Sequence, residues 1–364
     1  MMRKREYDIW LLITVIVLLA IGVIMVFSAS YYYAGLRYNN KFHFLIRQLL
    51  WSGVGLACML FVSNIDYRRL AILSPVLMLI SIILLILVAI PGIGSVSNDA
   101  RRWFNLGFTT FQPSELMKLS LIMFLSFSLA KNNDKLRYFF KGLLPYLLIV
   151  GFVDALLLLE PHYSCAVLIT AVAAVILFCA GARVLHFIAI GVPAIAGAVY
   201  LVLSSEYRLQ RFLSFMDPFA DPQGSGYQAV NSLYAIASGS IFGRGLGKSL
   251  QKYLYIPEPQ NDFIFSIVAE ELGFVGAFTV IVLFLLLIWR GVRISMNAPD
   301  MMGSLMAIGI TSLIAIESIV NIAVVTATVP VTGMPLPFIS YGGTSMLFHL
   351  MAIGILLNIS RNHT

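Results

Sequence analysis

The sequence Pro257-Glu258-Pro259-Gln260-Asn261-Asp262 opens directly into residues 263–289, FIFSIVAEELGFVGAFTVIVLFLLLIW. About 20 predominantly apolar residues are enough for a helix to cross the hydrocarbon core of a bilayer. Residues 263–289 therefore predict a transmembrane helix, and Asp262 is a carboxylate placed at its mouth. Similar apolar runs recur along the chain, so this kind of segment decides the fold.

The composition indicates that lipid is the main solvent of this chain. Of its 364 residues, 60% are hydrophobic and 11% are charged, and the mean hydropathy is +0.91. A soluble domain carries about 25% charged residues. We therefore predict an all-α polytopic membrane protein, with residues 1–364 forming a single membrane domain of about ten transmembrane helices. The predicted helices cover residues 9–29, 45–63, 70–90, 114–130, 142–159, 164–181, 184–203, 263–289, 302–326 and 343–360.

The basic residues predict the orientation, because Lys and Arg near short loops are retained in the cytoplasm. More than half of the 24 basic residues fall on the face that holds the N-terminus. They are Arg3, Lys4, Arg5, Arg68, Arg69, Lys131, Lys135, Arg137, Lys141, Arg183, Arg290, Arg293 and Arg361. We expect a multi-pass protein of the cytoplasmic membrane with both termini in the cytoplasm. The net charge of +7 reflects this bias, and we expect no nucleic-acid partner.

Residues 204–262 form a predicted extracytoplasmic loop between the seventh and eighth helices, far longer than a connecting turn requires. Aromatic and aliphatic residues recur along it, and such residues are scarce in disordered segments. The loop is therefore expected to be folded. A short amphipathic helix is predicted near residues 227–238, lying at the membrane interface.

Within this loop, Gly243-Arg244-Gly245-Leu246-Gly247-Lys248-Ser249 imitates the end of a nucleotide phosphate-binding loop. Phe242 replaces the first glycine of that motif and no strand precedes it, so nucleotide binding is not predicted. Two interpretations remain. The segment is either a flexible glycine-rich turn or a set of exposed backbone N–H groups that face a phosphate-bearing lipid head group together with Arg244 and Lys248.

Ionisable residues within the predicted helices are costly in a membrane and need partners. Glu115 and Lys118 are three residues apart on the fourth helix, so they share a face and can neutralise each other. The pair either holds neighbouring helices together or lines a substrate cleft. For the remaining acids of this kind we expect polar contacts between helices or a cavity lining; they are Asp154, Glu270, Glu271 and Glu317.

Asp262 has two interpretations. An Asp just before an apolar run is an ordinary helix N-cap. Alternatively, Phe263, Ile264 and Phe265 keep water away from its carboxyl group. Poor hydration raises a carboxyl pKa toward the range that suits a general base.

Four long motifs resemble the SEDS family, the proteins of shape, elongation, division and sporulation. They are RRWFNLGFTTFQPSELMK (101–118), DPQGSGYQAVNSLYAIASG (221–239), YIPEPQNDFIFSIVAEELGFVG (255–276) and VPVTGMPLPFISYGGTS (329–345). The resemblance covers essentially the whole chain, and the motifs occur in the family's order. The PEPQ before Asp262 is most similar to the division and sporulation branch, which contains FtsW and SpoVE, and less similar to the RodA branch.

The resemblance implies a ten-helix peptidoglycan glycosyltransferase that polymerises lipid II, the undecaprenyl-pyrophosphate-linked disaccharide peptide, for cell division or spore cortex synthesis. The family's essential carboxylate matches Asp262, and its charged pair matches Glu115 and Lys118. Members act with a class B penicillin-binding protein, a transpeptidase whose membrane anchor packs against the later helices. The chain departs from the family pattern at Asn261, at Glu160-Pro161-His162-Tyr163-Ser164 and at Ala327-Thr328.

For this reaction we expect Asp262 to act as the base that takes the proton of the acceptor hydroxyl. Cations must counter the charge that develops on the departing pyrophosphate, and a divalent cation, Mg²⁺ or Mn²⁺, is a further candidate; no organic cofactor is expected. The candidate side chains are Arg101, Arg102, Arg208, Arg211, Arg244 and Lys248. Arg101 and Arg102 have an equally simple interpretation as contacts to membrane lipid head groups. The segment 327–345, rich in Gly and Pro, is predicted to be irregular and to line the same cavity as Asp262.

Two other functions fit the same sequence. A lipid II flippase would need a polar path that reaches both faces of the membrane, whereas a polymerase gathers its polar groups on the outer one. A non-catalytic scaffold for the penicillin-binding protein would need neither a polar path nor polar groups gathered on the outer face. Asp262 would then be a helix cap. The long loop and Asp262 favour the polymerase.

Overall fold

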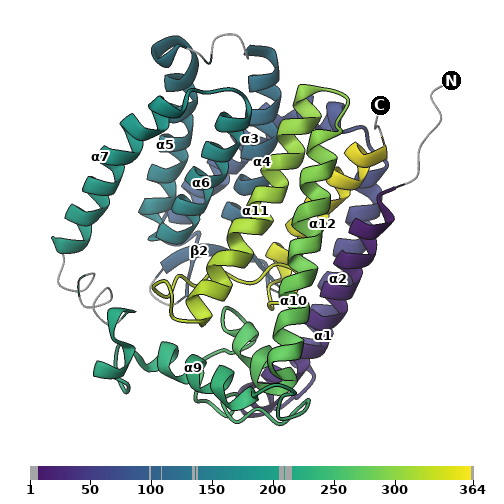
Figure 1. Cartoon of the computed structure of the whole chain (residues 1–364), viewed down its shortest axis with the longest axis vertical. Helices are drawn as coiled ribbons and strands as arrows, with labels where there is room; N and C mark the ends of the chain where they lie inside the picture. Colours follow the sequence, from purple (N-terminus) through teal and green to yellow (C-terminus); the bar gives the residue numbers. More distant parts are fainter. Residues whose placement is uncertain are drawn as a thin grey trace.

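The computed structural model describes residues 7–97, 100–107, 109–132, 136, 138–204, 209 and 215–361. Each of the ten predicted spans coincides with helical structure in it (Figure 1). These helices are α1 (Ile9–Tyr38), α2 (His43–Ser63), α3 (Tyr67–Ala89), α4 (Pro113–Asn132), η2 (Phe139–Leu143) continuing as α5 (Leu144–Leu159), α6 (Tyr163–Cys179), α7 (Val184–Leu203), α10 (Ile264–Met296), α11 (Met301–Val325) and α12 (Gly343–Arg361). In the described residues, eight helical stretches are long and apolar enough to cross a membrane, and α6 is a shorter apolar helix.

Helices α4, α11 and α12 form the enclosed centre of the bundle, whereas α2, α3, α5 and α10 expose more of their length. Helix α2 packs along α12, α3 along α4, and α11 against both α4 and α6. The buried residues Glu115, Lys118, Glu317 and His349 belong to this centre, whereas Glu270 and Glu271 lie buried on α10. The predicted all-α membrane fold is confirmed.

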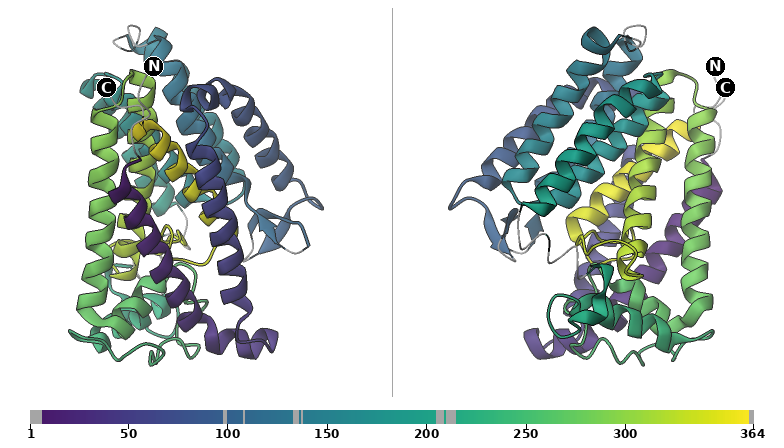
Figure 2. Two further views of the ribbon diagram at one scale, coloured as in Figure 1. Left: turned by 90° about the vertical axis from the view of Figure 1, so that its right-hand side faces the viewer. Right: turned by 60° about the vertical axis from the view of Figure 1, so that its left-hand side comes forward.

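Both termini lie at one end of the bundle, and the long loop lies at the opposite end (Figure 1; the same arrangement is seen in both views of Figure 2). Polar contacts hold the terminal end together. Arg361 donates to the hydroxyl of Tyr7 at 2.7 Å, and Arg290 pairs with Asp8 at 2.6 Å. The basic residues expected on one face thus include two that tie the chain ends to that face.

Two segments differ from the expected outline. Helix α1 continues nine residues beyond its predicted end, to Tyr38. Helix α10 is broken at Gly273, whose backbone (φ 68, ψ −167) is not helical. The N–H groups of Phe274 and Val275 bond there to the carbonyls of Ser240 and Ile241 instead. A side chain at position 273 would overlap the backbone of Gly243, so the break requires glycine.

The loop contains the predicted amphipathic helix, α9 (Tyr227–Gly239), and a short helix η3 (Pro218–Ala220). A small antiparallel sheet was not expected. It occupies the segment between α3 and α4, with strand order β1 (Ser95–Ser97), β2 (Ala100–Asn105) and β3 (Thr110–Phe111). Strands β1 and β3 have only three and two residues, and burial along the six residues of β2 does not alternate, so no period of two marks the sheet.

Candidate active site

Asp262 lies just ahead of α10, but it does not cap that helix. The N-cap position is Phe263, and among the described residues no side-chain cap bond is made there. Phe263, Ile264 and Phe265 are buried as expected. Burial, together with the nearby charge of Glu258, raises the pKa of the Asp262 carboxyl to about 6. The structure therefore does not support the cap, and the role of Asp262 as a base stays a prediction.

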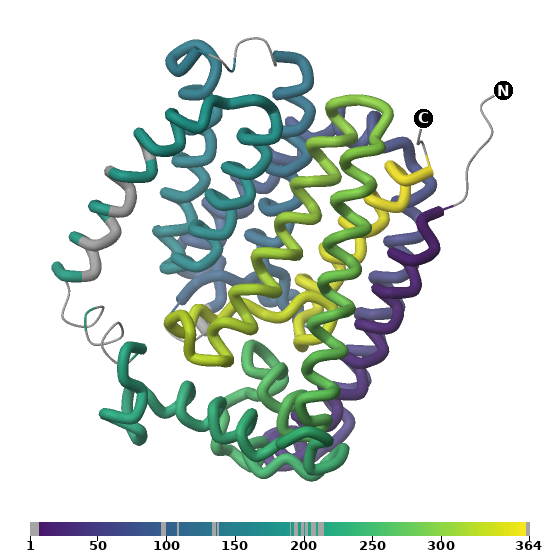
Figure 3. Tube along the Cα trace, in the orientation of Figure 1, coloured from purple at the N-terminus to yellow at the C-terminus, as the bar shows by residue number. Residues whose placement is uncertain are grey.

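The irregular segment that precedes α12 lies against Asp262, as the sequence predicted. The side-chain amide of Asn321 donates to the backbone carbonyls of Asp262, at 2.8 Å, and Met334, at 2.7 Å. The N–H of Tyr341 donates to the carbonyl of Gln260 at 2.8 Å. A methyl group built on Gly333 would lie 3.8 Å from the Asp262 carboxylate. The tube in Figure 3 shows this segment running back from the end of α11 into the bundle.

The pair Glu115 and Lys118 belongs to a larger buried cluster. The Lys118 ammonium lies 2.8 Å from Glu115 and 2.6 Å from Glu317 on α11. The other oxygen of Glu317 lies 2.5 Å from Nε2 of His349 on α12, and Nδ1 of His349 lies 2.7 Å from the carbonyl of Ser345. All four residues are at most 5% exposed. The cluster joins α4, α11 and α12, which supports the interpretation of the pair as a link between helices.

His349 was missed by sequence reasoning, because a single His inside an apolar run has no spacing that indicates a partner. Its contacts define its protonation. Because a carbonyl can only accept, Nδ1 carries a hydrogen, and one further proton is shared between Nε2 and Glu317. With that proton, the four side chains have no net charge, as a buried cluster requires.

The corner between α5 and α6, where the chain departs from the family pattern, is a second polar site. Arg102 on β2 donates to the carbonyl of Glu160 at 3.2 Å and to that of Pro161. The Glu160 carboxyl is 1% exposed, and neither of its oxygens has a hydrogen-bond partner among the described residues. Burial raises its pKa to about 8, although Arg102 opposes this. Ser164 donates to the carbonyl of Thr332 at 2.8 Å, which joins the corner to the segment beside Asp262.

We expect Glu160→Gln to stabilise the protein above neutral pH. The pKa of Glu160 in the folded state, about 8, exceeds the value of 4.5 for an unperturbed glutamate. The folded state therefore holds the proton while the unfolded state loses it, and stability falls as pH rises from about 4.5 to 8. Thermal unfolding in detergent at pH 5 and pH 8 should show a smaller loss for the variant, by on the order of a few kcal/mol. Exposed Asp217→Asn is the control, because an asparagine can keep the bond from the N–H of Phe219, and it should keep the wild-type profile. A wild-type profile for Glu160→Gln would contradict the assignment.

The glycine-rich turn at 243–249 binds carboxylates of its own chain. The Glu271 carboxylate accepts from the N–H of Gly247 at 3.0 Å and of Ser249 at 3.2 Å, and Glu270 accepts from Leu250 at 2.8 Å. Lys252 pairs with Glu271 at 2.9 Å. The interpretation of these N–H groups as open to a lipid phosphate is therefore wrong, since Glu270 and Glu271 already occupy them.

The predicted cationic residues are not all gathered at one place. Arg102 is held at the corner, and Arg101 pairs with Val96 in the sheet. Arg244 and Lys248 are exposed on the turn that packs on Glu270 and Glu271, about 12 Å along the helix from Asp262 at 1.5 Å per residue. Arg208 and Arg211 lie outside the described residues.

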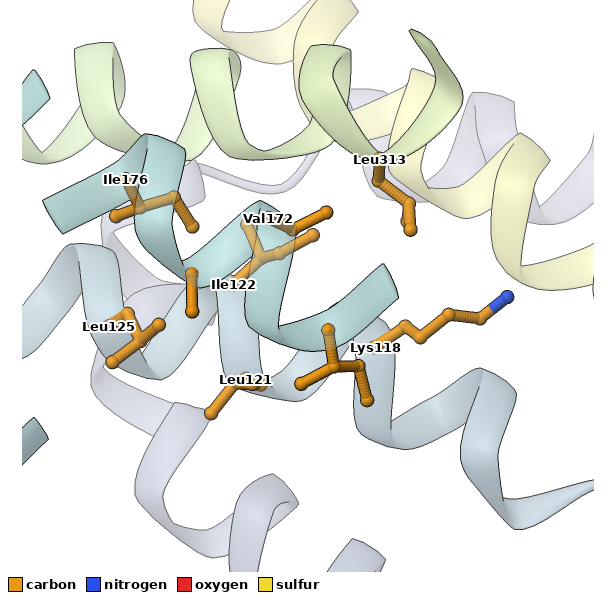
Figure 4. Close-up of a pocket in the computed structure, with 9 residues that line it drawn as sticks. Lys118, Leu121, Ile122, Leu125, Val172, Ile176 and Leu313 are labelled. Carbon is orange, nitrogen blue, oxygen red and sulfur yellow. The ribbon is translucent and has the colours of Figure 1, made fainter. Parts of the chain in front are cut away.

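Two recesses among the described residues are apolar. One, of about 10 Å³, lies between α4, α6 and α11, with Lys118 at one end (Figure 4). It has room for about one water molecule. The other is a groove between α3, α4 and α5, lined by residues such as Pro75, Phe124 and Phe152. Both are lined mainly by apolar side chains, which do not suit a sugar. On the neighbouring helices, the hydroxyl of Thr170 on α6 donates to the carboxylate of Asp154 on α5 at 2.5 Å.

Comparison with known proteins finds similarity over nearly the whole chain. The family model described as "Cell cycle protein" (FtsW, RodA, SpoVE) matches residues 9–364. Stage V sporulation protein E of Bacillus subtilis is 46% identical over 99% of this chain and 98% of its own length. The probable peptidoglycan glycosyltransferase FtsW of Trichlorobacter lovleyi is 43% identical over 98% of this chain and 94% of its own length.

Solved structures of similar proteins also match nearly the whole chain. A chain from the structural study of a peptidoglycan synthase complex that coordinates polymerization and crosslinking matches with a TM-score of 0.81 and 32% identity, covering 98% of each chain. The rod shape determining protein RodA of Thermus thermophilus matches with a TM-score of 0.72 and 29% identity, covering 98% of this chain and 97% of its own.

Proposed function

The chain belongs to the family of membrane-bound cell cycle proteins that contains FtsW, RodA and SpoVE, and we propose that it is a peptidoglycan glycosyltransferase that polymerises lipid II. The observation that carries this proposal is Asp262, a carboxyl group with a pKa of about 6 in a segment held by Asn321 and Tyr341. Relatives named as probable peptidoglycan glycosyltransferases support it.

In the proposed reaction Asp262 accepts the proton of a sugar 4-hydroxyl as that oxygen attacks the anomeric carbon of a muramyl pyrophosphate, inverting an α linkage to β. Hydrolysis of a glycoside needs a second carboxyl group to protonate its leaving alkoxide. A pyrophosphate is already a good leaving group, so one base is sufficient. A pKa of about 6 leaves Asp262 mostly ionised at neutral pH and still basic enough to take a proton.

We place the termini in the cytoplasm and the loop 204–262 on the outer face, as the basic residues at the terminal end support. The polyprenyl tail stays in the bilayer, and the head group meets the loop. Among the described residues no three His, Cys, Asp or Glu side chains gather to ligate a metal ion. Arg102, Arg244 and Lys248 remain candidates for neutralising the leaving group.

For the partner we propose a class B penicillin-binding protein acting as transpeptidase. The similarity to a chain of a peptidoglycan synthase complex supports an assembly of this kind. The similarities to a sporulation protein and to FtsW support a role in cell division or in spore cortex synthesis.

The test uses the purified full chain with its transpeptidase, supplied with lipid II in detergent and in vesicles. We expect glycan strands in both, and their formation without a second polymerase distinguishes an enzyme from a scaffold. Transfer of lipid II between vesicle leaflets with no polymer would instead identify a flippase and overturn the proposal.

A further inference from the structure

We propose that Asn321 is a positioning residue for the polymerisation reaction, fixing Asp262 through its backbone. This inference rests on the proposed function, because it gives Asn321 a role only if Asp262 is the base. Asn321 lies on α11, 59 residues along the chain from Asp262, and is 1% exposed.

The amide of Asn321 joins two segments that have no regular structure of their own. Its Nδ2 donates one hydrogen to the carbonyl of Asp262 and the other to that of Met334. Its Oδ1 accepts no hydrogen bond among the described residues. Both contacts therefore depend on the two hydrogens of Nδ2. An aspartate at position 321 would instead place a carboxylate oxygen against the two carbonyl oxygens.

We call the Asn321 amide, with its two bonds to the carbonyls of Asp262 and Met334, the clamp. It belongs to α11, and α11 is bonded to two other helices. Glu317 precedes Asn321 by four residues, one helical turn, and so lies on the same face of α11. Through Glu317 that face is bonded to Lys118 on α4 and to His349 on α12. The buried cluster and Asp262 are therefore joined by a single turn of helix. This connection gives the cluster a way to influence the site without touching the substrate.

Gly333 explains why the position of this backbone matters. It precedes Met334, has φ of 68, and is the residue whose absent side chain leaves room beside the Asp262 carboxylate. Moving Met334 relative to Asp262 changes that spacing and admits water. Because burial is the largest cause of the raised pKa, loosening the clamp should return the carboxyl toward the pKa of an exposed aspartate, about 3.9.

The test compares Asn321→Ala and Asn321→Asp with matched changes at Asn358. Asn358 is also a buried asparagine that clamps two backbones, accepting from Tyr67 N–H at 2.9 Å and donating to the Ser63 carbonyl at 2.8 Å, but at the terminal end. Asn321 variants should lose about 10- to 100-fold in kcat on lipid II with little change in KM, as expected when a catalytic group is misplaced. The acid limb of the pH profile should move to lower pH. The Asn358 variants should lower thermal stability without either change.

Hydrogen exchange of the lipid II-free protein provides a readout that needs no activity. Exchange at residues 260–264 and 333–336 should rise in the Asn321 variants and stay at the wild-type level in the Asn358 variants. Unchanged exchange, or a kcat loss no greater than at Asn358, overturns the positioning role and leaves Asp262 as the base. Raised exchange in Asn321 variants combined with full activity of Asp262→Ala would overturn the proposed function instead.

Discussion

Replacement of Asp262 by alanine is expected to lower the rate of glycan polymerisation by about 100- to 10,000-fold, the usual contribution of a general base. Folding should be retained, because the Asp262 side chain makes no cap bond to α10. The backbone carbonyl that Asn321 binds is also kept in the variant. Initial rates of polymer formation from lipid II, with thermal unfolding measured on the same preparations, provide the comparison.

The matched control is Asp66→Ala. Asp66 is the N-cap of α3 and accepts from the N–H of Arg68 at 2.9 Å. Losing this cap should cost about 0.5–2 kcal/mol of stability and leave polymerisation intact. If Asp262→Ala loses stability in the same way and still polymerises, Asp262 is structural.

The wild-type enzyme should also show an acid limb near pH 6. Asp262 acts as a base only when ionised, so the rate should rise as pH passes upward through its pKa of about 6. An ordinary exposed aspartate would place that limb about two units lower.

Removing Lys118 is expected to have the largest effect on stability. Lys118→Met leaves Glu115 and Glu317 buried without their shared cation. Breaking a buried ion pair in this way costs about 3–5 kcal/mol. Thermal unfolding in detergent and the yield of folded protein should both fall.

Arg68→Met is the matched control. Arg68 pairs with Asp300 at 2.7 Å, but their side chains are 47% and 31% exposed, and exposed pairs contribute about 0–1 kcal/mol. The double variant Lys118→Met with Glu115→Gln should recover part of the loss, because Glu115 is the acid left without a partner while Glu317 keeps its contact with His349. Equal stability of the two single variants would show that the cluster does not hold the bundle.

The sequence was informative where a single physical rule dominates. Length and hydropathy located the ten helices to within a few residues at most ends, and the spacing of Glu115 and Lys118 identified an ion pair. It was uninformative where partners are distant in the chain. Glu317 lies 199 residues from Lys118 in the sequence, and His349 lies 32 residues from Glu317. No local sequence pattern indicates that either residue belongs to the cluster. The interpretation of the glycine-rich turn as a lipid phosphate site failed for the same reason. The carboxylates that accept from its N–H groups, Glu270 and Glu271, follow 20 to 24 residues later in the sequence.

Gly273 breaks α10, whereas the sequence predicts one continuous helix there. An unbroken α10 would carry residues 262–272 in line with the rest of the helix, roughly 16 Å further along its axis at 1.5 Å per residue. Asp262 would then be carried away from the Asn321 amide on α11 and from the Gly333 backbone, which now lie beside it. One residue without a side chain thus turns the acid back toward its neighbours on α11 and in the segment before α12.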